Sequence, residues 1–259
     1  PSLIGSGPGD DYATLYAAAA DFNSVAGGCT GDWDVFITSD LTEPANVAFG
    51  NNVPTSYTVT IRPLAGVTPT INFTQTTVGA VPGHWVIGSN NPADLASLVK
   101  TDNFIINGCA GDAWSTRSLT IQNLNTASIA NSRLILVYGD SDNFTIKNCN
   151  LINGSRSVAD NGCTGVEFTS RLEAGISYIP DYGTVDNCSI NVLSGTATTG
   201  RYGTGIKQFY SGTITSGQAQ RGLTVRNCEI DARYVGIFLA QTAGADIHDN
   251  TIRLDQYSV

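Results

Sequence analysis

Four segments in the second half of the chain superimpose on one another, and this repeat restricts the possible folds more than any other feature. Each segment reads x-h-I-x-N-C/N-x-I, where h is a mixed position. The segments begin at Phe144, Gly183, Leu223 and Ala245, and a fifth, at 119–125, fits with Leu124 in the cysteine slot. Short strand patterns that recur in the same direction predict stacked structural units rather than an independent sheet.

The spacing of the repeat predicts how these units stack. The cysteine slot is filled by Cys149, Cys188, Cys228 and Asn250, which are 39, 40 and 22 residues apart. A unit of 22 residues is too short for a strand-helix-strand crossover. A second strand, most often opening on Gly-Ile or Gly-Val, precedes most units, at 134–137, 165–168, 205–208 and 236–239. The spacing therefore predicts the coils of an all-β parallel solenoid, with inserted loops in the longer coils.

Stacking places identical slots in columns, because neighbouring coils lie about 4.8 Å apart. One column expected at a turn is Asn148, Asn187, Asn227 and Asp249, in which side-chain amides can hydrogen-bond from coil to coil. The cysteine slot forms a second column. Three cysteines in one column cannot all pair with each other, so buried free thiols are favoured over disulfides, although sequence alone leaves both open.

The rung G-I-x-L … I-x-N-N-x-I resembles the right-handed parallel β-helix repeat shared by pectate lyases, polygalacturonases, tailspikes and many large secreted bacterial proteins. Within that group the chain looks most like the non-enzymatic domains of large surface proteins. The resemblance implies one right-handed β-helix domain over residues 1–259. The same fold carries many unrelated functions, so it implies little about activity.

The first third of the chain is less regular. An Ala-rich stretch predicts a helix near 11–24, capped by Asp10 or Asp11, inside an N-terminal cap spanning 1–30. Irregular first coils are expected over 31–117 and regular coils over 118–259. The strand-like runs of the irregular part lie at 35–38, 57–62, 70–73, 85–88 and 104–107. No capping element is expected after the last repeat, so that coil should dock onto another copy of the protein or the rest of a longer chain.

Charge excludes several classes of partner. The chain carries 13 Lys and Arg against 22 Asp and Glu, giving a net charge of −9. No basic cluster could neutralise phosphates, so neither nucleic acid nor an anionic membrane is expected as a partner. No apolar run approaches the ~20 residues that span a bilayer. An acidic, Lys-poor chain without a leader segment indicates an extracellular or cell-surface protein from which a signal peptide has been removed.

Catalytic chemistry finds little support in the residues. Enzymes that share the resemblance cleave acidic polysaccharides with clustered carboxylates, calcium, and Arg or Lys projecting from one parallel sheet. The outward residues beside the Asn column carry mixed charges, with no two carboxylates on adjacent coils: Gln122, Lys147, Asp186, Arg226 and His248. No catalytic residue or cofactor is therefore predicted. Asp140 and Asp142 form a weak calcium candidate, for which an Asx turn is the preferred interpretation. Glu167 and Lys207 are expected on a solvated, mutually paired surface together with Arg171 and Glu173.

These observations favour an extracellular, non-enzymatic structural or adhesive module that assembles end to end into filaments. The alternatives are a polysaccharide lyase or glycoside hydrolase with an unfamiliar site, and a protein that binds glycans without cleaving them. A cluster of acidic residues in a groove along one sheet would favour the enzyme, and a glycan array would test binding without cleavage.

Overall fold

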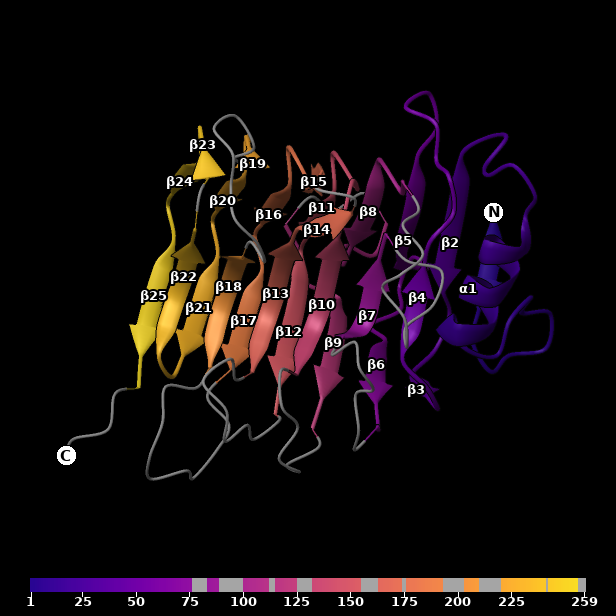
Figure 1. Cartoon of the computed structure of the whole chain (residues 1–259). Helices are drawn as coiled ribbons and strands as arrows, with labels where there is room; N and C mark the ends of the chain where they lie inside the picture. The colour runs from indigo at the N-terminus through magenta and orange to yellow at the C-terminus, as the bar shows by residue number, and fades with distance from the viewer. Residues whose placement is uncertain are drawn as a thin grey trace.

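The computed structural model confirms a single right-handed parallel β-helix, with three long parallel sheets and one short helix at the N-terminal end (Figure 1). It describes residues 1–75, 83–88, 100–111, 115–124, 132–154, 163–173, 176–192, 203–209, 220–240 and 242–255. Residue 125 of the fifth repeat and residues 256–259 lie outside this part of the chain. Each regular coil contributes one strand to each long sheet.

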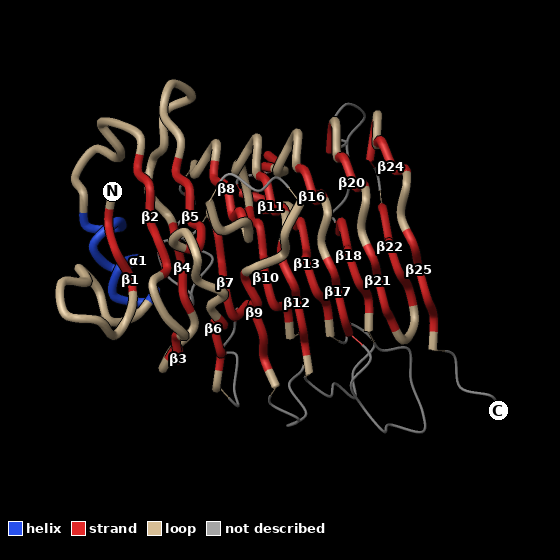
Figure 2. The backbone as a smooth tube through the Cα atoms, turned by 180° about the vertical axis from the view of Figure 1, so that it is seen from behind, coloured by secondary structure: helices blue, strands red, loops and turns tan. Residues whose placement is uncertain are grey.

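The strands of one sheet lie side by side along the stack (Figure 2). Sheet A contains β1 (Ser2–Ile4), β2 (Trp33–Ile37), β5 (Val59–Pro63), β8 (Phe104–Asn107), β11 (Thr145–Lys147), β16 (Thr184–Asp186), β20 (Thr224–Arg226) and β24 (Asp246–His248). Sheet B contains β3 (Leu41–Glu43), β6 (Thr70–Phe73), β9 (Leu119–Asn123), β12 (Cys149–Asn153), β17 (Ser189–Val192), β21 (Glu229–Ala232) and β25 (Thr251–Leu254). Sheet C contains β4 (Val47–Phe49), β7 (Gly83–Ile87), β10 (Arg133–Tyr138), β13 (Thr164–Thr169), β18 (Thr204–Phe209) and β22 (Val235–Leu239). Two short pairs lie outside the coils: β14 (Arg171–Glu173) with β15 (Ile176–Tyr178), and β19 (Gln220–Arg221) with β23 (Thr242–Ala243).

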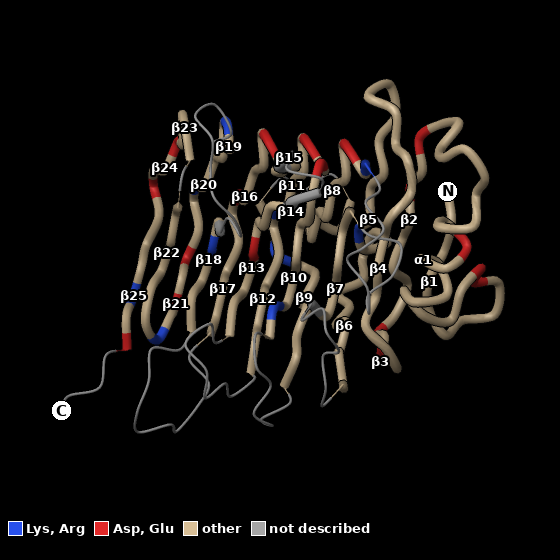
Figure 3. The backbone as a smooth tube through the Cα atoms, in the orientation of Figure 1, with Lys and Arg blue, Asp and Glu red and all other residues tan. Residues whose placement is uncertain are grey.

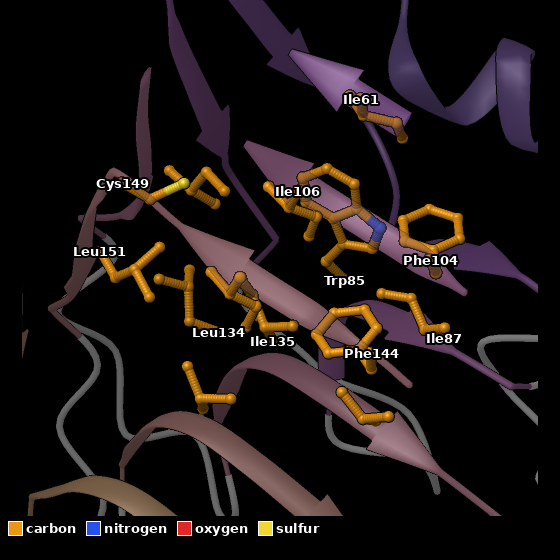
Figure 4. Close-up of a cluster of buried hydrophobic side chains, with 14 of the residues drawn as sticks. Ile61, Trp85, Ile87, Phe104, Ile106, Leu134, Ile135, Phe144, Cys149 and Leu151 are labelled. Atoms are coloured by element: carbon orange, nitrogen blue, oxygen red, sulfur yellow. The ribbon is translucent and has the colours of Figure 1, made fainter. Parts of the chain in front are cut away.

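The interior is filled by columns of like side chains, because alternate residues of every strand point inward. Ile106, Ile146, Val185 and Val225 form one such column in sheet A, and all are fully buried. Figure 4 shows the apolar side chains of the three sheets meeting around Trp85. The core is therefore one continuous column along the stack.

Two corners of the coil use left-handed backbone. The Asn column sits at the corner between sheets A and B, where Asn148, Asn187, Asn227 and Asp249 all have φ between 49° and 58°. Asn and Asp tolerate this conformation better than most residues. A second such corner precedes sheet A, and its residues are Asn103, Asn143, Tyr182 and Gly222.

The glycines of the Gly-Ile slot lie inside strands of sheet C. A Cβ on Gly165 would lie 2.6 Å from a methyl of Ile190, and one on Gly205 would lie 2.3 Å from a methyl of Ile230. These glycines therefore make room for the isoleucine column of sheet B.

The fifth repeat is in a different sheet from the other four. Leu119 pairs with Cys149, so the segment forms β9 of sheet B and Gln122 bonds to Asn72 there. The coil's true sheet A strand is β8, and Gly108 follows it at the corner. Both sheets share the same alternation of apolar residues, so the pattern alone cannot distinguish them. Of the residues between the two strands, 109–111 and 115–118 are described, and the Gly108 carbonyl accepts the N–H groups of Ser118 and Leu119.

Helix α1 (Leu15–Ser24) covers the first coil, and it begins later than the sequence predicts. Asp10 and Asp11 do not cap it, because their carboxylates accept the N–H groups of Gly7 and Leu3 in the preceding turn. Thr14 is the N-cap instead, and its hydroxyl accepts the N–H of Ala17 at 3.1 Å.

Glu43 completes the N-terminal end of the helix. Its buried carboxylate accepts the N–H groups of Leu15 at 2.7 Å and Tyr16 at 3.0 Å. Burial raises the pKa of Glu43, and the two N–H groups offset only part of that shift. The helix start is therefore fixed by a residue of sheet B, which no local pattern reveals.

Replacing Thr14 by alanine is expected to lower the free energy of unfolding by about 1 kcal/mol, because one N–H of the first turn loses its acceptor. Chemical denaturation of the full chain measures this change. Thr42→Ala is the matched control, since Thr42 lies exposed on β3 and caps no helix. An equal loss in both variants would contradict the capping role.

At the other end of the described stack, apolar side chains that would point into the core are exposed. Ile247, Ile252 and Leu254 expose 43–44% of their surface. Docking of another copy or of further chain onto this coil stays a prediction.

Candidate functional site

A groove of about 820 Å³ runs along the outer face of sheet A beside the Asn corner. Thr145 and Thr184 contribute to its lining, and the described residues between β8 and β9 contribute Cys109, Gly111 and Ser115. The remaining lining residues are Arg62, Asn107, Lys147, Asn148, Asp186, Asn187, Arg226 and Asn227. We call this site the ladder groove. Because its residues come from successive coils, it extends along the stack and suits a long ligand.

The charged residues of the ladder groove occupy one outward column of sheet A. Lys147 pairs in register with Asn107 on one side and with Asp186 on the other, and Asp186 pairs with Arg226. Arg62 lies one residue beyond the Ile61–Ile106 pair and so continues the column. The lining thus carries three cations and one carboxylate, in a chain with a net charge of −9.

Asp186 is held in its charged form. Partial burial alone would raise its pKa, but the hydrogen bond from Asn227, the bonds from Arg226 and the charges of Arg226 and Lys147 together lower the pKa below its ordinary value. Arg226 donates to the carboxylate through Nε at 3.0 Å and Nη2 at 2.8 Å. Asp186 is consequently a poor proton donor and a fixed acceptor.

The Asn column forms one wall of the groove as a side-chain ladder. The amide of Asn148 donates to Asn107 Oδ1 at 2.9 Å, and the amide of Asn187 donates to Asn148 Oδ1 at 2.8 Å. The next amide does not continue this series: Asn227 donates to Asp186 Oδ1 at 2.9 Å and not to Asn187. Asp249, the next member, bonds to the His248 ring instead.

Residues 115–118 are held against this ladder. Arg117 donates to the backbone and side-chain oxygens of Asn187 and forms an ion pair with Glu229 at 2.9 Å. The Ser115 carbonyl accepts the amide of Asn187 at 3.1 Å. The wall of the groove is therefore built from contacts between distant parts of the chain, which sequence reasoning missed.

The cysteine column lies directly behind the ladder, and its thiols are free. Cys149, Cys188 and Cys228 are buried. Their thiols donate to backbone carbonyls two residues upstream, at 3.1 Å for Cys149 and Cys228 and at 3.4 Å for Cys188. Burial raises the pKa of the Cys188 thiol well above its ordinary value, so this thiol is unreactive. Asn250, the fourth member, accepts the N–H of Cys228 and donates to the carbonyl of Val225.

Of the two calcium candidates, Asp142 belongs to a second ladder, at the corner that precedes sheet A, and Asp140 lies two residues before it. Asp102 accepts the N–H of Asp142, Asp142 accepts the N–H of Asp181, and Asp181 accepts the N–H of Arg221, each at 2.8–2.9 Å. Acidic positions recur along this rim (Figure 3). Asp102, Asp142 and Asp181 are 40 and 39 residues apart, close to the spacing of the repeat. This spacing was the sequence signal that could have revealed the second ladder.

A lysine supplies the positive charge at this rim. Lys100 Nζ lies 3.5 Å from Asp102, 3.5 Å from Asp140 and 3.7 Å from Asp142. Within the described part of the chain, no group of three or more His, Cys, Asp or Glu is arranged to hold a metal ion. Calcium at Asp140 and Asp142 stays a prediction.

Glu167 and Lys207 are not solvated, contrary to the sequence interpretation. Glu167 is 1% exposed and lies in sheet C next to Lys207, which is 8% exposed. Its carboxylate pairs with Arg133 Nε at 2.8 Å and with Lys207 Nζ at 3.5 Å. Burial lowers the pKa of Lys207, and the attraction of Glu167 offsets only part of that. A polymer cannot reach a cluster so deeply buried, so it is a structural ion cluster.

His84 belongs to a buried polar network between sheets B and C. Its Nε2 lies 2.9 Å from the Asn123 amide nitrogen and 3.1 Å from the Ser132 hydroxyl. The Asn153 amide donates to the carbonyls of Ser132 and Thr164. Burial lowers the pKa of His84 to about 4. The folded protein therefore keeps the His84 ring neutral at pH 7.

This histidine should make the protein less stable in acid. The folded state binds the proton more weakly than the unfolded state, whose pKa is about 6.5, so the stabilisation is complete above that pH and is lost as pH falls through about 4. The loss amounts to about 3 kcal/mol. Denaturation of wild type and His84→Gln at pH 7 and pH 4 measures it, because glutamine does not titrate. Identical pH dependence in both proteins would contradict this assignment.

Comparison with known proteins identifies solved structures with a similar fold. No family model matches the chain, and no curated protein matches it. Among solved structures, the pectin methylesterase of Aspergillus niger is similar with a TM-score of 0.43 and 10% identity, covering 100% of this chain and 89% of that one. A pectin methylesterase in complex with a hexasaccharide is similar with a TM-score of 0.44 and 12% identity, covering 92% of this chain and 80% of that one.

These neighbours are enzymes that act on a carbohydrate, whereas the sequence favoured a non-enzymatic adhesive module that assembles into filaments. That main expectation is corrected, because the matched structures are pectin methylesterases. At 10–12% identity the likeness to these neighbours shows the fold alone. The site and its ligand must therefore be inferred from this chain's own residues. No helix in the described residues is long and apolar enough to cross a membrane.

Proposed function

We propose that this chain is an extracellular carbohydrate-active protein that binds an acidic polysaccharide in the ladder groove. The observation that carries the proposal is the concentration of Arg62, Lys147 and Arg226 in one groove of a strongly acidic chain. A cationic groove on an otherwise negative protein attracts anionic ligands and orients them. Arginine and lysine also form charge-assisted hydrogen bonds with carboxylates.

The rest of the lining suits a sugar polymer. Thr145, Thr184 and the amides of the Asn ladder offer hydrogen-bond donors and acceptors for hydroxyl groups. The groove crosses several coils, so successive sugars would meet equivalent positions of successive strands. A small metabolite would use only a fraction of this length.

If the bound polymer is also cleaved, the groove fits β-elimination better than hydrolysis. Hydrolysis uses two carboxylates, and among the described lining residues Asp186 alone is acidic, already paired with Arg226. In β-elimination a base removes the proton from the carbon next to the sugar carboxylate, a carbon–carbon double bond forms, and the glycosidic oxygen leaves with the bonding electrons and takes up a proton from water. In this step Lys147 in its neutral form would be the base, and Arg226 would pair with the sugar carboxylate.

Binding of polyuronates to wild type and to Lys147→Gln/Arg226→Gln tests the proposal. We expect affinity to fall at least about ten-fold in the double variant, and binding to weaken with added salt. Arg253→Gln is the matched control, because Arg253 lies exposed on β25 outside the groove. Equal binding by all three proteins would contradict the site. Ultraviolet absorbance of the unsaturated product reports cleavage separately.

A further inference from the structure

The cations of the ladder groove lie on alternate strands of sheet A. Arg62 is on β5, Lys147 on β11 and Arg226 on β20. The strands between them, β8 and β16, place Asn107 and Asp186 at the same position of the column. The column therefore reads cation, amide, cation, carboxylate, cation.

This alternation sets a distance. Neighbouring parallel strands lie about 4.8 Å apart, so equivalent cations two strands apart are separated by roughly 10 Å. The threonines that line the groove show no such alternation, because Thr145 on β11 and Thr184 on β16 lie on adjacent strands. The groove thus offers hydroxyl groups on these two adjacent strands and positive charge on every second strand.

Asp186 adds a repulsive element to the pattern. It lies between Lys147 and Arg226 and is held charged by Arg226, Asn227 and Lys147. A ligand carboxylate facing the β16 strand would meet this negative charge at close range. The column therefore disfavours a polymer with an anion facing the sheet at every strand.

We infer that the ligand of the ladder groove is an extended two-fold polyuronate, in which every second carboxylate faces sheet A. The inference rests on the proposed function and narrows its ligand class. In a two-fold chain each sugar is turned half a revolution from the last, so carboxylates on one edge recur at every second sugar. In a three-fold chain the carboxylates on one edge recur at every third sugar. That period does not match cations that lie on every second strand.

Calorimetric titration of the full chain with three oligosaccharides of equal length tests the inference. The probes are a β-1,4-linked mannuronate oligomer, which is two-fold, an α-1,4-linked galacturonate oligomer, which adopts a three-fold helix, and the carboxyl-reduced mannuronate oligomer. We expect the first to bind about ten-fold more tightly than the second, and the third to bind weakest. Equal affinity for both acidic oligomers would overturn the inference and leave the proposed function intact. Absence of binding by either acidic oligomer would overturn both.

A charge-relocation variant separates spacing from net charge. Arg62→Asn combined with Asn107→Arg moves one cation by one strand without changing the composition of the groove. We expect the preference for the mannuronate oligomer to fall at least about three-fold, because two cations then lie on adjacent strands. Asp186→Asn tests the repulsive element without moving a cation, and should raise affinity for the galacturonate oligomer. An unchanged preference in both variants, with wild-type circular dichroism spectra, would overturn the inference.

Discussion

Replacing Phe144 by alanine is expected to lower the free energy of unfolding by about 3–5 kcal/mol. Phe144 is fully buried, and its ring lies 6.0 Å from Phe104 in a stacked arrangement and 6.4 Å from Phe168 edge-on. Phe49 extends this aromatic column to the earlier coils, 5.3 Å from Phe104. Deleting the central ring leaves a cavity that rigid coils on both sides cannot close.

Thermal and chemical denaturation measure this loss. Phe238→Ala is the matched control, because Phe238 projects outward from β22 and is 41% exposed, so it should change stability by less than about 1 kcal/mol. Similar losses in both variants would show that the aromatic column does not carry the stability assigned to it.

Replacing Glu167 by glutamine is expected to lower the free energy of unfolding by about 3–5 kcal/mol, because Arg133 and Lys207 then keep buried charges without their carboxylate partner. The loss should be reduced when Lys207→Met is added, since one of the two buried charges is then removed. Denaturation of the single and double variants at neutral pH measures both effects.

Asp231→Asn is the control for this ion cluster. Asp231 pairs with Arg253 at 3.2 Å, but Arg253 is 63% exposed, so the pair should contribute only about 0–1 kcal/mol. If Glu167→Gln were no more harmful than Asp231→Asn, the buried cluster would be energetically unimportant.

The architecture could be predicted from the sequence because each coil repeats the same apolar alternation. Ile146, Val185, Val225 and Ile247 share a column in the structure, as the repeat predicts. The left-handed corner also follows from the Asn at 148, 187 and 227. The fifth repeat was assigned to sheet A instead of sheet B because the strands of both sheets bury the same alternation of apolar residues. Only the corner residue after β8 distinguishes the two sheets. That residue is Gly108, and a Cβ there would lie 1.9 Å from the Asn148 carbonyl oxygen.

The site was harder to predict than the fold. Lys147, Asp186, Arg226 and His248 were recognised as outward residues beside the ladder, but their mixed charges were read as evidence against catalysis. Arg62 was missed, because it comes from the irregular part of the chain and joins the column only through the pairing of β5 with β8. The loop wall was missed for the same reason, since Arg117 meets Asn187 across 70 residues of sequence.

Buried polar groups explain the remaining errors. Glu43 of sheet B caps helix α1, which lies far from it in sequence. Glu167 is buried and pairs with Arg133 and Lys207, where a solvated surface was expected. Burial of a charged residue depends on what covers it and not on its own neighbours in sequence. Alternation places Glu167 on the outward side of β13 correctly, but it carries no information on whether that side meets water.

The parallel pairing has a mechanical consequence. The backbone hydrogen bonds between coils point along the long axis, from β1 at one end of sheet A to β24 at the other. Tension applied along this axis loads the bonds of every coil in series, so the end coil yields first and exposes the next. The protein would lengthen in steps, each releasing one coil of 22 to 45 residues, and would resist shear across the stack far better than pulling along it.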